Sequence, residues 1–153
     1  MANTQAMTTS FKGEILTATH NFGVAPTRGA STADTFKAAL YITTATLGAA
    51  TTAYTVTGEV SGTGYTPGGV TVTNATVPAT SGTTAYWTPS ASITYSSVTL
   101  STAFDAVLIY NSTQSNKAVS VHTFGSQTIT AGTFTLTQPS NTTSTALIRL
   151  ATT

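Results

Sequence analysis

The chain has 153 residues, of which nine are Asp, Glu, Lys or Arg and about a quarter are Thr. An ordinary globular domain carries about 25% charged residues, so little electrostatic repulsion keeps copies of this chain apart. The net charge of +1 comes without a Lys/Arg cluster, which argues against nucleic acid as a partner. Cys is absent, which excludes disulfides and thiolate metal sites. Because Thr suits a pleated sheet, the composition indicates a β-protein, either part of an assembly or a Thr-rich soluble domain.

The segment 10–22 is the best helix candidate in the chain. Phe11, Ile15 and Phe22 fall on one face at helical spacing, and Ser10 can cap the start. So short a helix must be stabilised by docking its apolar face. That face packs either against the chain's own domain or, in the sharper interpretation, against a neighbouring subunit.

Two strands are predicted next along the chain. Apolar residues alternate along 35–42, which favours a strand, although Asp34 before an Ala-rich run could also cap a helix. We predict the strand. The stretch 53–60 is predicted as a second strand, with Tyr54 and Val56 on its buried side.

A glycine-rich loop follows over 62–68. It superficially resembles a phosphate-binding loop, but Pro67 stands where the last glycine of G-x-G-x-x-G belongs. It also leads into a strand at 70–73, so no helix N-terminus is available for an anion. The sequence therefore predicts a surface loop or a contact arm here.

Short strands are predicted at 85–88 and 92–95. The stretch 98–100 continues the second of them, and the phase of alternation slips between the two. Such a slip is typical of a β-bulge, which we place at Ser96-Ser97.

The strongest β signal is a hairpin over 106–121. Two apolar runs, 107–110 and 118–121, flank a polar tip of Asn, Ser, Thr and Gln. The first run shows no polar alternation, which predicts a strand covered on both faces at the centre of the core.

Further strands are predicted at 127–130 and 133–137, joined by a compact hairpin at Ala131-Gly132, and at 146–150. Some eight to ten short strands with regular turns are typical of a sandwich or barrel. We therefore predict an all-β fold, an antiparallel sandwich or jelly-roll-like barrel with one short N-terminal helix. The chain is expected to form a single domain over 1–153, with an N-terminal arm and helix in 1–25 and a β core in 35–150.

Residues suited to proton or metal chemistry are sparse. His20 and His122 are far apart and lack metal-ligand spacing. A glycosidase-type carboxylate pair would need half of the four acids, and no G-x-S-x-G motif is present. We therefore predict no catalytic residue, no metal site and no cofactor, and expect the protein not to be an enzyme.

Aromatic and aliphatic residues are the remaining candidates for contact with a partner. Adjacent Tyr86 and Trp87 are predicted to point to opposite faces of a strand, so we expect one of them to face solvent, where an aromatic ring can anchor an interface or stack on sugars. A partner interface is predicted at Phe11, Ile15, Phe22, Tyr65 and Trp87. The N-terminus has no basic start or apolar signal core, and no run reaches the ~18 apolar residues of a membrane span, so neither secretion nor a membrane partner is expected.

Several stretches spread along nearly the whole chain belong together: Ser10–Leu16, His20–Phe22, Asp34–Lys37 leading to Leu40-Tyr41, Thr52–Thr55, Gly58–Val60, Gly62–Tyr65, Leu108–Ser112, Asn116–Val119 and Ala146–Leu150. In their residues and their order they resemble a group of small Thr-rich structural proteins of tailed bacteriophages. They are fold-type signatures rather than an active-site motif.

The resemblance implies a virion component, for which we take a capsid cement or decoration protein as the expected role. Its partners would be the major capsid protein of the same phage and further copies of itself, as a homo-oligomer and most simply a trimer. It would be made in the host cytoplasm and sit on the outer surface of the capsid. The alternatives are a tail, neck or fibre component, or a module that binds carbohydrate or a host surface through Tyr65, Tyr86 or Trp87.

Overall fold

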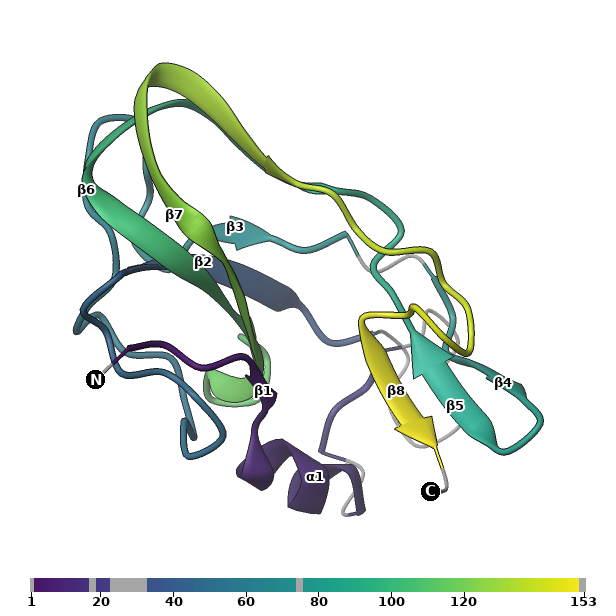
Figure 1. The fold of residues 1–153 in the computed structure, drawn as a ribbon. Helices are drawn as coiled ribbons and strands as arrows, with labels where there is room; N and C mark the ends of the chain where they lie inside the picture. The colour runs from purple at the N-terminus through teal and green to yellow at the C-terminus, as the bar shows by residue number, and fades with distance from the viewer. Residues whose placement is uncertain (1, 17–18, 23–32, 74–75, 152–153) are drawn as a thin grey trace.

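The computed structural model describes residues 2–16, 19–22, 33–73 and 76–151 (Figure 1). Its elements are β1 (Ala6–Met7), α1 (Thr9–Leu16), β2 (Phe36–Ile42), β3 (Val70–Thr71), β4 (Ala79–Ser81), β5 (Thr84–Trp87), β6 (Ile93–Asn111), β7 (Lys117–Leu136) and β8 (Ile148–Ala151). All strand pairs are antiparallel, in one sheet of order β1-β7-β6-β2-β3 and a smaller one of order β4-β5-β8. The predicted all-β, sandwich-like fold with one short helix is confirmed. The barrel alternative is wrong, because β1 and β3 are open edges of the larger sheet.

The predicted central hairpin is formed by β6 and β7. Asn111 pairs with Lys117 at its closed end, and β2 pairs along the other side of β6. Successive residues of β6 enter two apolar clusters: Val107 packs into one and Leu108 into the other, on opposite faces of the sheet. The expectation of a strand covered on both faces is confirmed.

Beyond this region, β6 and β7 continue as a long ribbon that curves over the rest of the molecule (Figure 1). The pairing register shifts between Tyr95 and Val98, and Ser97 has a φ of 55°, so the predicted bulge is confirmed. The predicted hairpin at Ala131-Gly132 is wrong. Ala131 has a positive φ of 45°, but Gly132 pairs with Val98 and β7 runs on, because the long partner strand keeps both halves of β7 paired.

The stretch 53–60 is not a strand. It contributes two isolated bridges, and Val56 is 69% exposed instead of buried. The backbone turns here: the amide of Glu59 donates to the carbonyl of Val56 (3.2 Å), and Gly58 closes the turn at a φ of 80°. The strand predicted over 35–42, by contrast, is β2, and the helical alternative for it is wrong.

The N-terminal helix is shorter than predicted. It begins at Thr9, and His20 and Phe22 lie outside it. Its cap is Thr8 rather than Ser10, since the amide of Phe11 donates to Thr8 Oγ1 (3.4 Å). Residues 17–18 of the predicted helix, and 23–25 of the predicted arm, lie outside the described residues.

Candidate functional site

An apolar groove of about 130 Å³ lies between α1, the segment 19–22 and the smaller sheet. We call it the aromatic groove. Pairing of β5 with β8 places Trp87 beside Ile148 and Ala85 beside Leu150, so these four residues share one face of the smaller sheet. That face lines the groove, and none of its described lining residues is Asp, Glu, Lys or Arg.

Stacked rings form the floor of the aromatic groove. Phe22 lies parallel to Phe36, with ring centroids 4.4 Å apart, and against Trp87 at 4.8 Å. Phe11 meets both Phe22 and His20 edge-on. Such packing fixes the rings in place, and the indole Nε1 of Trp87 also donates to the carbonyl of residue 76 (2.9 Å).

Four of the five predicted interface residues come together here: Phe11, Ile15, Phe22 and Trp87 all line the groove. Phe11 and Trp87 are nevertheless almost fully buried within the chain, at 0% and 2% exposure. They therefore shape the groove from below, while Ile15 and Phe22 are half-buried. Sequence patterns did not indicate Leu150, an exposed member of the lining at 43%, since its exposure depends on how β8 pairs.

Tyr65, the fifth predicted residue, lies elsewhere and is buried. Its hydroxyl donates to Glu59 Oε1 (2.7 Å) and accepts from the amide of Leu40 (3.0 Å), and its ring stacks near Tyr95. Burial and the bond to Glu59 raise the pKa of Tyr65 far above its ordinary value. The expectation that Tyr65 or Trp87 could offer an exposed ring to a sugar is wrong, and Tyr86 is half-buried.

The glycine-rich loop is also held by Glu59. The amide of Gly68 donates to Glu59 Oε1 (2.7 Å), and the amide of Gly69 to the carbonyl of Thr66 (2.9 Å). These amides are thus occupied, and Gly69 is packed against the backbone of β2. The loop therefore packs on β2 with an exposed tip, and the amides of Gly68 and Gly69 are not available to an anion.

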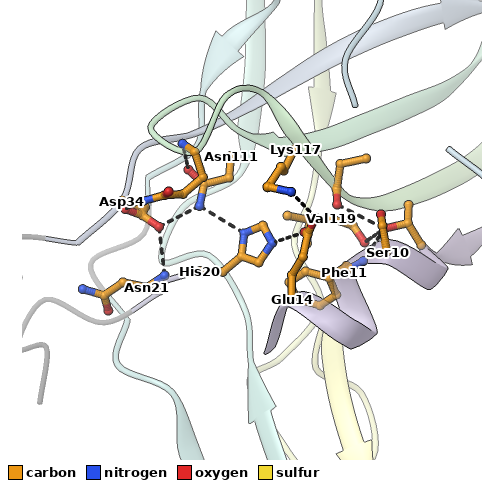
Figure 2. A network of polar contacts seen from close by, with 12 residues as sticks. Ser10, Phe11, Glu14, His20, Asn21, Asp34, Asn111, Lys117 and Val119 are labelled. Carbon is orange, nitrogen blue, oxygen red and sulfur yellow. Dashed lines mark hydrogen bonds and ion pairs between the residues drawn. The ribbon is translucent and has the colours of Figure 1, made fainter. Parts of the chain in front are cut away.

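A polar network joins α1 to the hairpin tip beside the aromatic groove (Figure 2). Lys117 Nζ donates to Glu14 Oε1 and His20 Nε2 donates to Glu14 Oε2, both at 2.6 Å. On its other side, His20 Nδ1 lies 3.1 Å from the side-chain amide of Asn111, which also donates to Asp34 (2.7 Å). The His20 side chain is fully buried, so this network ties the segment 19–22 to the tip.

The network selects one tautomer of His20. Asn111 Oδ1 accepts from the amides of Thr113 and Gln114, which orients the Asn111 amide nitrogen toward His20. His20 Nδ1 must then accept, which leaves the proton on Nε2 to be donated to Glu14. The histidine is held between two fixed partners, which suits an anchor better than a proton shuttle.

Replacing Glu14 with Gln is expected to lower the free energy of unfolding at pH 7 by about 2 kcal/mol, the scale of a hydrogen bond to a charged group. Burial raises the pKa of Glu14, but the bonds from Lys117 and His20 outweigh it and hold that pKa below its ordinary value. The folded state therefore binds fewer protons, and the stabilisation is lost as pH falls through the folded pKa.

Urea unfolding at pH 7 and at successively lower pH measures this effect. The two proteins should converge on acidification, because the wild-type carboxylate becomes protonated. Lys12→Gln, on the exposed side of the same helix, is the matched control and should change stability by less than about 0.5 kcal/mol. A constant gap between wild type and Glu14→Gln across the titration would contradict the assignment.

Within the described residues, no three His, Cys, Asp or Glu side chains lie close enough to hold a metal ion. His20 lines the aromatic groove, whereas His122 lies on β7 and lines a different hollow, so the two histidines do not share a site. In the part of the chain that the structure describes, no helix is long and apolar enough to cross a membrane.

The aromatic groove is therefore a packed, uncharged and partly exposed surface feature. Comparison with protein-family models, with curated proteins and with solved structures found no match for this chain.

Proposed function

We propose that the chain is a structural protein of a tailed-bacteriophage virion, a capsid cement or decoration protein that binds the outer shell. The proposed virion role rests on the resemblance that runs along nearly the whole sequence. The observation that supports an assembly role independently is the aromatic groove, which combines apolar lining with an exposed Leu150 on an almost uncharged molecule. A neutral surface can pack beside its copies without repulsion.

In this proposal the protein adds buried area where capsid subunits meet. A stable contact buries about 1,600 Å² in total, more than the groove alone provides, so neighbouring surface would take part. A homo-oligomer, which we propose to be a trimer, would make several such contacts at once. Linked contacts raise the overall affinity without any single strong one.

The copy number of the protein in purified particles tests the proposal. A number comparable to that of the major shell protein is expected for a cement or decoration protein. A small, tail-like number would place it in the tail, neck or fibre instead. Absence from particles would overturn the virion role, and glycan-array binding would then test the carbohydrate-binding alternative.

Leu150→Thr is expected to weaken binding to the shell about five- to tenfold. Leucine buried at a contact contributes more than threonine by about 1 kcal/mol, which is roughly this factor in affinity. Binding of the purified variant to particles that lack the protein measures the change. Threonine suits a β-strand and Leu150 is 43% exposed, so folding should be unaffected.

Val56→Thr is the matched control, since Val56 is exposed but does not line the aromatic groove. It should bind as wild type does. Equal binding by Leu150→Thr and wild type would show that the groove rim is not in the contact, whatever the copy number in particles turns out to be.

A further inference from the structure

The outer side of β7, beyond its short contact with β1, has no strand beside it in the part of the chain that the structure describes. β1 pairs with only two residues of β7, Ser120 and Val121, and the rest of β7 pairs with β6 alone. Two glutamine side chains bond the carbonyls of Gly125 and Leu136. Between these points, the residues 126–135 present outward backbone groups that no described strand meets. We call these residues the β7 edge.

The β7 edge lacks most of the devices that keep exposed strands from pairing with other chains. It contains no Asp, Glu, Lys, Arg or Pro. The strands at the other edges of the two sheets, β1, β3, β4 and β8, have only two to four residues each. The only positive φ within the β7 edge is that of Ala131, where the strand bulges.

The neighbouring strand of the ribbon is less suited to an added strand. On β6, the bulge at Ser97 breaks the outer side, and the amide of Thr99 already donates to the carbonyl of Thr63 (2.9 Å). The β7 edge is therefore the longer free template for a strand that binds by main-chain hydrogen bonds.

The sequence of the β7 edge indicates which strand fits it. It is nearly palindromic about the point between Ala131 and Gly132, because Thr-Ile-Thr at 128–130 mirrors Thr-Phe-Thr at 133–135. If two copies pair antiparallel about a twofold axis at that point, each Thr faces a Thr, and Ile129 faces Phe134 of the second copy. Pairs of threonines and pairs of an aromatic with a β-branched residue both stabilise antiparallel strands.

The exposure of these side chains agrees with such a register. Ile129 and Phe134 are half-buried and pack against the same core cluster, whereas the four threonines around them are exposed. The bulge keeps this division of faces on both sides of Ala131, so residues that would meet lie on matching faces. Threonines already pair in this way within the sheet, since the hydroxyl oxygens of Thr94 on β6 and Thr135 on β7 are 3.5 Å apart.

We propose that the β7 edge is an interface at which β7 pairs antiparallel with β7 of a second copy, about a twofold axis between Ala131 and Gly132. The two ribbons then join into one of four strands. No Asp, Glu, Lys or Arg occurs from 118 to 148, so the copies meet without charge repulsion. A twofold contact cannot close a trimer, so this interface is additional to any trimer contact and does not depend on the proposed virion role.

Sedimentation velocity over a concentration series tests the association, which should give a dimer, or a dimer of trimers where the trimer forms. Thr130→Lys/Thr133→Lys places Lys opposite Lys twice in the proposed register and should weaken the association about fivefold or more. Thr130→Glu/Thr133→Lys places Glu opposite Lys at the same positions and should associate at least as tightly as wild type. Thr57→Lys/Thr66→Lys adds the same charge at exposed positions outside β7 and should associate as wild type does.

The chain has no cysteine, so introduced cysteines report the register directly. Opposite residues of an antiparallel pair have Cα atoms about 4.5–5.5 Å apart, which a disulfide can span. A mixture of Thr130→Cys and Thr133→Cys proteins should cross-link mainly between the two variants, and each variant alone should cross-link little.

Three outcomes would overturn the proposal. The first is a wild type that shows no twofold association at any concentration, which is read on the unmodified protein and does not depend on the folding of a variant. The second is a Thr130→Lys/Thr133→Lys variant that associates as tightly as the Thr130→Glu/Thr133→Lys variant. The third is cross-linking of each cysteine variant with itself as fast as with the other.

Discussion

Replacing Gly69 with Ala is expected to lower the free energy of unfolding by at least about 4 kcal/mol, which places it among the exceptional single substitutions. A Cβ at this position would lie 1.7 Å from the carbonyl oxygen of Ala38 and 2.8 Å from Cα of Ala39. Both atoms belong to the backbone of β2, which is held between β3 and β6 and cannot move aside cheaply. The φ of 72° adds strain of its own. Urea unfolding, or the yield of folded protein, measures the effect.

Two other glycines separate the clash from the backbone strain. Gly82 has a φ of 56° but no atom within 4 Å of an added Cβ, so Gly82→Ala should cost only about 1–2 kcal/mol. Gly125 has open space around it as well and no positive φ, so Gly125→Ala should be nearly neutral. If Gly69→Ala lowered the free energy of unfolding no more than Gly82→Ala does, the close packing of the glycine-rich loop on β2 would be wrong.

Phe36→Ala is expected to cost about 3–5 kcal/mol, the range for removing a buried aromatic ring. Phe36 is fully buried at the start of β2, stacks on Phe22 and lies near Trp87 (6.1 Å between centroids). Removing it leaves a cavity under the floor of the aromatic groove. Chemical denaturation followed by tryptophan fluorescence reports both the stability and the surroundings of Trp87.

Phe36→Leu is the matched control, because it keeps most of the apolar volume and should cost less than about 2 kcal/mol. Leu150→Ala, at the exposed rim of the same groove, should cost less than about 1 kcal/mol. Similar losses for Phe36→Ala and Leu150→Ala would contradict the assignment of Phe36 to the core.

The pattern of apolar and polar residues correctly predicted those strands whose own sequence shows which faces are buried. The apolar run 107–110 lies between two clusters, and the alternating run 35–42 is strand β2. It failed in two places, one where a local turn was missed and one where a distant partner decides the outcome. Val56 looks like a buried strand residue, but a turn closed by Gly58 turns it to solvent. Ala131-Gly132 suits a hairpin turn and a bulge equally well, and only the length of β6 selects the bulge.

The candidate sites show the same division. Spacing grouped Phe11 with Ile15 on one helix face, and both line the aromatic groove. Phe22 reaches the groove although it lies outside α1. Leu150 carries no local signal, because its exposure depends on how β8 pairs with β5.

The pairing of β2 with β6 also governs when the chain can fold. Asp34 and Asn111, which hydrogen bond at the start of that pairing, are 77 positions apart. A nascent chain therefore holds β2 without its central neighbour until the hairpin has been synthesised. Pairings so distant in sequence close slowly, on the scale of milliseconds to seconds in all-β domains. The protein is thus expected to reach its folded state only after synthesis of the hairpin is complete, and chains truncated before the hairpin lack the central neighbour of β2.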